Sequence, residues 1–334
     1  MILKDNFERE FDYLRISLTD RCNLRCFYCM PEEGVKLFKR EEILSLEEIE
    51  FLVEFFYKNF SIKKVRFTGG EPLLRKGFED LVIKIKKNIP EIELNITTNG
   101  ILLKEKVIFL KDFGIKVNLS LDTLNRIKFK KITGFDFLDE IIEGLDLCNK
   151  LKIPLKINTV MLKGINDEEI FDLIEFSGEK GIPIRFIEYM PLSGNANWKK
   201  FFISKKEIIE KIKAKYDIIY YEKEKIAENY ILYLNNDKKF LAKVGFISTI
   251  TDTFCNSCSR LRITSDGNMV LCLFDKNSYN LKEFLRPEVR EKELYDFILK
   301  IVKLKPEGFI ALKKSFFDKG ENIKSFFVMR KIGG

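Results

Sequence analysis

Short runs rich in β-branched and aromatic residues alternate with longer amphipathic stretches over the first two thirds of the chain. The short runs predict strands at residues 13–19, 64–68, 93–98, 115–121, 155–162 and 182–190. The helical spacing of apolar residues in the longer stretches predicts helices at residues 45–60, 77–89, 102–114, 135–151 and 166–181. Ser45 and Ser61 are candidates to begin or end helices. Asn166 or Asp167 is expected to begin the last helix, and Gly181 to end it.

Strands that alternate with helices predict an α/β fold with a parallel sheet, here a partial (β/α)6 TIM-like barrel or, alternatively, a doubly wound sheet. Polar motifs follow four of the strands, at residues 68–71, 97–100, 120–122 and 188–190. In a β/α barrel this edge carries the chemistry. After about residue 215 the pattern changes to shorter, mixed strands, with a hairpin turn expected at 235–237. We therefore predict a barrel domain at residues 1–215 and a smaller α+β domain at residues 216–334.

Composition adds three restrictions. The net charge of +8 is modest for 334 residues, which favours local basic pockets for an anionic substrate over a nucleic-acid-binding surface. No signal peptide or long apolar segment is visible, so a cytoplasmic protein without a membrane or nucleic-acid partner is expected. The chain contains no histidine, which excludes Ser–His and Cys–His nucleophiles and leaves thiolates or carboxylates as metal ligands.

Three of the seven cysteines, Cys22, Cys26 and Cys29, lie in the sequence CNLRCFYC directly after the first predicted strand. Three thiols cannot all form internal disulfides, and a structural zinc site takes four ligands. An iron–sulfur cluster is held by thiolates, and a cubane held by only three would keep one iron open for a ligand. Arg21 and Arg25 are expected to favour the thiolate forms. Three ordinary buried thiols are the alternative.

A second group of thiols has the spacing C-x2-C-x13-C, at Cys255, Cys258 and Cys272. Gly267 is expected to turn a hairpin that brings Cys272 back beside the first two. One interpretation is a zinc site; the other, which the redox context favours, is a second three-thiolate cluster. The fourth zinc ligand would be Asp252, Asp266 or Asp275.

Two arginines follow this second group. In an extended chain Arg260 and Arg262 project to the same face, where two guanidinium groups can bind phosphate. Ordinary surface charges are the alternative. Arg15 and Arg66 lie within otherwise apolar strands, where a charge needs a partner, and a bound anion would be one.

The sequence CNLRCFYC resembles the signature of the radical S-adenosylmethionine superfamily, and FTGGEPLL at residues 67–74 extends the resemblance. The resemblance implies a partial β/α barrel and a [4Fe–4S] cluster held by Cys22, Cys26 and Cys29. The open iron of that cluster would bind S-adenosylmethionine, which is cleaved to a 5′-deoxyadenosyl radical. Contacts with S-adenosylmethionine are implied for Tyr28, Gly70, Ser120 and Met190.

Further motifs narrow this resemblance. Several segments, spread over essentially the whole chain, are similar to those of the GTP 3′,8-cyclase family of molybdenum cofactor biosynthesis. They are VRFTGGEPLLR, TTNG, NTVMLKGIND, FIEYMPL, CNSCSRLRITSDG and a terminal Gly-Gly. This implies conversion of GTP to 3′,8-cyclo-7,8-dihydroguanosine 5′-triphosphate, with a second [4Fe–4S] cluster on the C-terminal domain that binds the guanine. The implied GTP contacts are Arg15, Arg66, Thr97 (or Thr98), Lys156, Arg260, Leu261 and Arg262.

The resemblance also implies a reducing electron donor and a downstream cyclic pyranopterin monophosphate synthase as partners, while a homodimer is one of the oligomeric states left open. It places the terminal Gly333 and Gly334 in the active site; a frayed end is the alternative. Cys148, inside a predicted helix, is expected to be a core residue. Two other functions stay open: a peptide-modifying radical enzyme with an auxiliary cluster, and a non-catalytic metal-binding scaffold.

Overall fold

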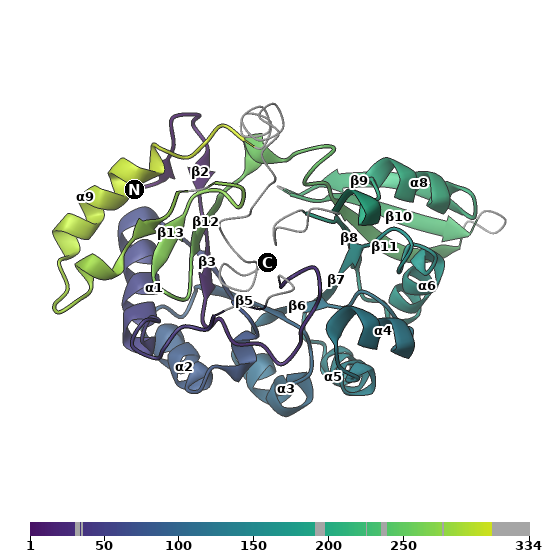
Figure 1. The fold of residues 1–334 in the computed structure, drawn as a ribbon, viewed down its shortest axis with the longest axis horizontal. Coiled ribbons are helices and arrows are strands. Elements are labelled where there is room, and N and C mark those ends of the chain that lie inside the picture. Colours follow the sequence, from purple (N-terminus) through teal and green to yellow (C-terminus); the bar gives the residue numbers. More distant parts are fainter. Residues whose placement is uncertain are drawn as a thin grey trace.

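The architecture comes from a computed structural model, which describes residues 1–30, 34, 36–190, 198–224, 226–234, 239–275 and 277–308. A curved sheet forms the centre, and helices cover its outer side (Figure 1). The inner wall is made by parallel strands that follow one another in chain order: β3 (Tyr13–Ser17), β4 (Lys64–Thr68), β5 (Glu93–Thr98), β6 (Lys116–Ser120), β7 (Leu155–Met161) and β8 (Ile184–Glu188). The predicted partial barrel is confirmed.

The helices on the outer side connect these strands. They are α1 (Leu46–Phe60), α2 (Phe78–Asn88), α3 (Leu103–Asp112), α4 (Arg126–Thr133), α5 (Leu138–Lys150) and α6 (Ile170–Lys180). All but α4 were predicted from the sequence. Cys148 lies fully buried in α5, which confirms its assignment to the core.

The helix ends predicted from the sequence agree with the structure except at the start of α6. The Ser45 side chain accepts from the Glu48 amide at 3.1 Å, and Glu48 accepts from the Ser45 amide at 2.7 Å, so α1 begins with a capping box. Gly181 ends α6 in a left-handed conformation, as predicted. The expected start at Asn166 or Asp167 is wrong, because α6 begins after Glu169. Both side chains instead accept amide hydrogen bonds within the preceding loop.

Alternation within the strands separates the core from the interior of the barrel. In β3, Leu14 and Ile16 are fully buried on the helix-covered side, whereas Tyr13 and Arg15 face the interior cavity. Arg15 is paired in register with Arg66 of β4 and, on its other side, with Arg262. The parallel register therefore gathers cationic side chains on one face of the sheet.

The C-terminal part of the chain extends this sheet at both edges. At one edge β11 (Phe240–Ile247) pairs in parallel with β8, followed by β10 (Glu228–Leu234) and β9 (Tyr216–Lys223). At the other, β12 (Arg260–Ile263) pairs in parallel with β3, followed by β13 (Asn268–Val270) and β14 (Tyr279–Asn280). Strands from before and after residue 215 thus share one sheet, so the sheet does not mark a domain boundary there. The predicted boundary at residue 215 stays a prediction.

The β12–β13 hairpin turns at Gly267, whose φ of 82° favours glycine, and this turn was predicted. The hairpin turn expected at 235–237 lies outside the described residues. The remaining elements are β1 (Leu3–Lys4), β2 (Glu10–Phe11), α7 (Trp198–Phe201), α8 (Lys205–Lys213), α9 (Glu291–Val302) and the short 3-10 helices η1 (Pro72–Leu74), η2 (Cys255–Ser257) and η3 (Lys282–Phe284). Within the ranges described above, no helix is both long and apolar enough to cross a membrane.

Candidate active site

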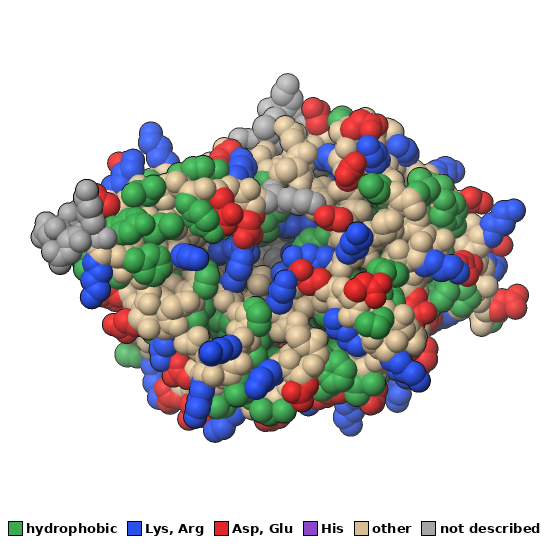
Figure 2. Space-filling model, turned by 180° about the vertical axis from the view of Figure 1, so that it is seen from behind, with side chains coloured by type: hydrophobic (Ala, Val, Ile, Leu, Met, Phe, Trp, Pro, Cys, Tyr) green, Lys and Arg blue, Asp and Glu red, His purple; other side chains and the backbone are tan. Residues whose placement is uncertain are grey.

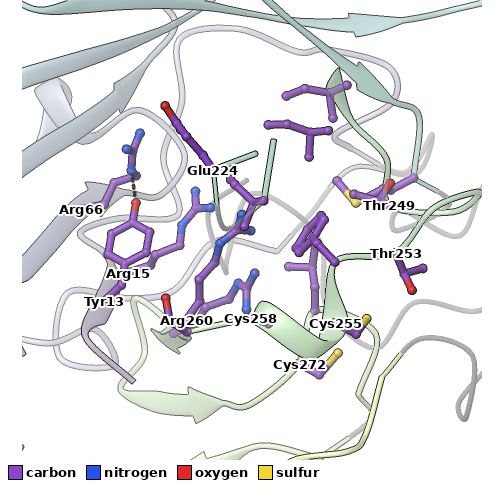
Figure 3. Close-up of a pocket in the computed structure, with 18 of the residues that line it drawn as sticks. Tyr13, Arg15, Arg66, Glu224, Thr249, Thr253, Cys255, Cys258, Arg260 and Cys272 are labelled. Carbon is purple, nitrogen blue, oxygen red and sulfur yellow. Dashed lines mark hydrogen bonds between the residues drawn. The ribbon is translucent and has the colours of Figure 1, made fainter. Parts of the chain in front are cut away.

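A cavity of about 620 Å³ lies on the inner side of the curved sheet. In the space-filling view this face of the molecule is hollowed near its centre, with Lys and Arg side chains around the hollow (Figure 2). The volume falls within the range of about 300–1,000 Å³ that is usual for small-molecule sites. The close-up shows Tyr13, Arg15, Arg66 and Arg260 on one side of the cavity and Cys255 and Cys272 on the other (Figure 3).

The cavity is strongly cationic. Arg66, Arg185, Arg260 and Arg262 all line it, and each is at most 8% exposed. Burial, followed by the charge of Arg262, lowers the pKa of Arg260 to about 10, and burial also lowers the pKa of Arg15 well below its usual value. Such crowding of like charges at low dielectric is unfavourable without an anion. The cavity therefore suits a ligand that carries several negative charges.

Few carboxylates line the cavity to balance its positive charges. Among the described residues that line the cavity, Asp12 and Glu224 are the acidic ones. Glu224 accepts from Lys156 at 3.1 Å and from Arg185. The predicted GTP contact Lys156 is therefore bound to a carboxylate of the cavity wall, but it does not itself line the cavity. A bound anion would compete with Glu224 for both cations.

Arg66 organises the polar wall between β3 and β5. Its guanidinium donates to the Tyr13 hydroxyl, to Thr97 Oγ1 at 3.2 Å and to Asn95 Oδ1 at 3.3 Å. Thr98 points the other way and donates to Glu71 at 2.8 Å. Of the two threonines that the sequence left open, the cavity-facing one is Thr97.

The thiols of the second group all belong to this cavity. All three line the cavity: Cys255 begins η2, Cys258 directly follows η2, and Cys272 lies two residues after the end of β13. Burial raises the pKa of Cys258, but the charges of Lys305, Arg260 and Arg262 outweigh it and lower the pKa to about 7. Three thiols on one wall and a cationic surrounding fit an anionic cluster held by thiolates. No three Cys, Asp or Glu side chains in the described ranges form a group compact enough to bind a single metal ion.

The first group of thiols lies in the loop after β3, at the carboxyl edge of the barrel. Burial, followed by the charges of Cys29, Asp122 and Cys22, raises the pKa of Cys26 well above its usual value. The prediction that arginines favour thiolates here is therefore wrong for Cys26. Arg25 instead donates to the carbonyls of Cys22 at 2.6 Å and Leu24 at 2.8 Å, which fixes the loop backbone. Converging thiols at this edge fit a cluster whose metal, rather than an arginine, stabilises the thiolates.

The glycines at residues 69–70 bring the β4–η1 turn against the cysteine loop. The Gly70 amide donates to the Thr19 carbonyl at 2.7 Å, and the Glu71 amide donates to the Arg21 carbonyl at 2.7 Å. A Cβ atom at Gly70 would lie 2.1 Å from the Arg21 carbonyl oxygen, closer than any side chain can approach. Only glycine at residue 70 permits this contact.

Gly70→Ala is therefore expected to displace the loop that carries Cys22. We expect the variant to lose binding of S-adenosylmethionine by more than about 10-fold, the lower end of what loss of a supporting contact costs at a metal site. Equilibrium binding to the cluster-loaded protein measures it. Gly164→Ala is the control, because Gly164 also has a positive φ, but no atom of the described residues beyond its two chain neighbours would lie within 4 Å of a Cβ there. Equal losses in both variants would contradict the role of Gly70.

Two buried carboxyl groups support the same edge, and neither was assigned a role from the sequence. Glu71 accepts from the Leu73 and Asn99 amides and the Thr98 hydroxyl, and burial still raises its pKa to about 7. Asp122 accepts from the Tyr28 hydroxyl at 2.5 Å and the Val160 amide at 2.8 Å, and burial raises its pKa to about 6. Each is the last residue of a polar motif that follows a predicted strand, at 68–71 and 120–122, so these motifs could have identified them.

A pH dependence of stability follows from Glu71. Its folded-state pKa lies above the usual 4.5, so its contribution is fully present below pH 4.5 and is lost as the pH rises through about 7. The free energy of unfolding should fall by about 3 kcal/mol across this window because of Glu71. Asp122, whose pKa is raised from 3.8 to about 6, should add a fall of similar size, about 3 kcal/mol, between pH 3.8 and 6. The chain has no histidine to obscure the effect. Urea unfolding of the cluster-free protein at pH 5, 6 and 7 measures it; an equal fall in Glu71→Gln would contradict the assignment.

The other predicted contacts of S-adenosylmethionine are Tyr28, Ser120 and Met190, which lie on separate segments of the chain. Tyr28 packs edge-on against Tyr189, with its hydroxyl fixed by Asp122. Ser120 lies half-buried at the carboxyl end of β6, and Met190 lines the cavity. These positions bring Tyr28 and Ser120 to the same barrel edge as the first cysteine group.

Leu261 differs from its neighbours Arg260 and Arg262. Its side chain is fully buried in the apolar core, because alternation along β12 points it away from the cavity. Any contact of Leu261 with a ligand would come from its backbone.

Sequence reasoning missed several cavity residues, including Arg185, Asn118, Asn158 and Lys305. Arg185 interrupts an apolar strand just as Arg15 and Arg66 do, so the same signal could have identified it. The buried Asn158 Oδ1 and Arg262 Nε have no hydrogen-bond partner in the part of the chain that the structure describes. Buried polar atoms without partners are unfavourable, which further indicates a bound ligand.

The comparisons with known proteins agree with this geometry. The family profile "Radical SAM superfamily" matches residues 16–177, and "Molybdenum Cofactor Synthesis C" matches residues 182–310. The chain is 42% identical over 336 aligned residues to a GTP 3′,8-cyclase of Thermodesulfovibrio yellowstonii, which covers 99% of this chain and all of the relative. The chain belongs to the GTP 3′,8-cyclase family. Membership of the radical S-adenosylmethionine superfamily implies one [4Fe–4S] cluster and S-adenosylmethionine.

Longer relatives and solved structures add context to the GTP 3′,8-cyclase family. Molybdenum cofactor biosynthesis protein 1 of Dictyostelium discoideum is 44% identical over 305 residues, and the chain spans about half (48%) of its length. Among solved structures, Streptococcus suis SuiB bound to S-adenosylmethionine has a TM-score of 0.61 at 18% identity, over 95% of this chain and 72% of SuiB. At this identity the likeness shows the shared fold alone.

Proposed function

We propose that this protein is a radical S-adenosylmethionine enzyme that converts GTP to 3′,8-cyclo-7,8-dihydroguanosine 5′-triphosphate in the first step of molybdenum cofactor biosynthesis. The observation that carries the proposal is one cavity that combines buried arginines from β3, β4, β8 and β12 with the thiols of the second cysteine group. A triphosphate and a ring that can bind metal are the two features such a cavity would recognise. The full-length identity to GTP 3′,8-cyclases supports this choice of substrate.

Cys22, Cys26 and Cys29 would hold the cluster that binds S-adenosylmethionine. A [4Fe–4S] cluster held there would supply an electron for reductive cleavage of S-adenosylmethionine, and the resulting radical would remove the C3′ hydrogen of GTP. Tyr28, Gly70, Ser120 and Met190 would position S-adenosylmethionine, with Asp122 fixing the Tyr28 hydroxyl.

Cys255, Cys258 and Cys272 would hold a second [4Fe–4S] cluster, whose open iron would bind the guanine. The lowered pKa of Cys258 and the cations around it support thiolate ligation at neutral pH. Arg15, Arg66, Arg260 and Arg262, with Lys156 and Arg185, would bind the triphosphate, and Thr97 would add a polar contact. The phosphates would displace Glu224 from Lys156 and Arg185.

The family further implies a reducing electron donor and a downstream cyclic pyranopterin monophosphate synthase, and we propose both as partners in a cytoplasmic pathway. A homodimer is proposed as the assembly to test first. The terminal Gly333 and Gly334 lie outside the described residues, and their entry into the active site is kept as a proposal.

Equilibrium binding separates this function from a peptide-modifying one. With both clusters loaded, we expect the protein to bind GTP tightly and to show no saturable binding of an unrelated peptide. Binding of peptide without binding of GTP would overturn the proposal. The structural likeness to SuiB does not favour the peptide alternative, because it shows the fold alone.

A further inference from the structure

A buried ion pair lies in the turn of the N-terminal β1–β2 hairpin. Arg9 Nε is 2.6 Å from Asp5 Oδ2, and the two side chains are 5% and 0% exposed. The other Asp5 oxygen accepts from the amides of Phe7 at 2.8 Å and Arg9 at 3.1 Å, so the turn itself fixes the carboxylate. Burying such a pair is unfavourable unless the remaining donors are satisfied.

The remaining donors of Arg9 bind backbone carbonyls of the second cysteine group and of the segment after α9. The guanidinium donates to the Cys255 carbonyl at 3.1 Å, the Glu307 carbonyl at 2.7 Å and the Pro306 carbonyl at 2.6 Å. One side chain thus joins three segments: the hairpin, the cysteine loop, and the segment after α9. Charge-assisted hydrogen bonds of this kind are stronger than neutral ones and fix orientation.

The segment after α9 reaches the same thiols by two further contacts. A Cβ atom at Gly308 would lie 2.6 Å from Cys255 Cβ and 3.0 Å from its sulfur, so the backbone here packs directly on the cysteine. The Lys305 ammonium is 3% exposed and donates to the Arg260 carbonyl at 3.3 Å and to the Leu271 carbonyl. Leu271 directly precedes Cys272, and Arg260 lies two residues after Cys258.

We propose that Arg9 is a positioning residue for the second cysteine group. By holding the Cys255 carbonyl and the segment 306–307 together, it fixes the direction of the Cys255 thiol toward the cavity. Outer contacts that orient ligands in this way typically matter about 10–100-fold for metal affinity. Asp5 neutralises the guanidinium, so Arg9 acts mainly through geometry. The inference rests on the proposed function, in that the second group must hold a cluster.

The test isolates the second group in the full-length chain. In a parent variant with Cys22, Cys26 and Cys29 all replaced by alanine, iron bound after anaerobic reconstitution reports on the second group alone. Release of that iron to a chelator is then compared among the parent, Arg9→Gln, Asp5→Asn and the control Arg286→Gln. Arg286 is a matched arginine, since it binds Glu48 and the carbonyls of Glu41 and Ile43, all outside the cavity. Unfolding midpoints and the electron paramagnetic resonance spectrum of the reduced cluster are recorded for each.

We expect Arg9→Gln to release iron about 10-fold faster than the parent and to alter the spectrum. Asp5→Asn keeps the turn and should have a smaller effect in the same direction, and it decides the matter if Arg9→Gln does not fold. Arg286→Gln should leave iron release unchanged even if its unfolding midpoint falls. Parental release rates in both hairpin variants, or equal acceleration in Arg286→Gln, would overturn the role of Arg9. A parent that binds no iron would instead overturn the second cluster itself.

Discussion

Cys22→Ser is expected to abolish formation of 5′-deoxyadenosine, whereas Cys258→Ser is expected to preserve it and to abolish conversion of GTP. The reason is spatial: Cys22 lies in the loop after β3, whereas Cys258 lines the cationic cavity. Loss of a direct ligand should exceed the roughly 10–100-fold effect that is typical of lost outer contacts. Chromatography of 5′-deoxyadenosine and of the GTP product, from the same anaerobic reaction, measures both activities.

Cys148→Ser is the matched control for these two variants. Cys148 is fully buried in α5, and burial raises the pKa of its thiol to about 11, so it has the character of a core residue. Serine there should lower stability and leave both products measurable. If Cys258→Ser leaves both products at parental levels, the second cysteine group has no part in GTP conversion.

Arg262→Gln is expected to weaken GTP binding without destabilising the empty protein. Its Nε has no partner within the described ranges and its side chain is 4% exposed, so the substitution breaks no internal bond at that atom. It also removes a charge that repels Arg15 and Arg260. A hydrogen bond to a charged group contributes about 1.5–3 kcal/mol, so the dissociation constant for GTP should rise about 10–100-fold.

Calorimetric titration with GTP measures the affinity, and thermal unfolding of the ligand-free protein measures the stability. Together they test whether Arg262→Gln lowers the first without lowering the second. Arg290→Gln is the control, since Arg290 pairs with the exposed Glu293 at 2.7 Å and lies outside the cavity. We expect the unfolding midpoint of Arg262→Gln to stay level or rise. A fall in stability with unchanged GTP affinity would show that Arg262 is a structural residue.

The barrel could be predicted because its signals are local. Alternation in a strand such as β3 and the apolar stripe of a helix such as α1 are set by burial of neighbouring residues. The short helix α4 was missed, since its eight residues bury only Phe129, Ile132 and Thr133. The addition of β11 and β12 to opposite edges of the barrel was also missed, because pairing between distant segments leaves no local pattern.

The residues of the candidate site also fall into those that the sequence could predict and those that it could not. The thiols and the arginines of β3, β4 and β12 stood out because their residue types conflict with their surroundings, and Arg185 could have been found by the same reasoning. Glu224, Lys305 and Arg9 could not, because each acquires its role only when the C-terminal segments pack against the barrel. The prediction for Arg25 failed because a cation that is near a thiol in sequence need not contact it in space: Arg25 binds the Cys22 carbonyl instead.

We propose that one cavity brings GTP to the radical formed at the first cysteine group. The most direct measurement incubates the reduced, cluster-loaded protein with S-adenosylmethionine and GTP that carries deuterium at C3′. We predict that deuterium appears in 5′-deoxyadenosine and that the nucleotide product has lost it. Unlabelled 5′-deoxyadenosine together with GTP that keeps its deuterium would contradict the account.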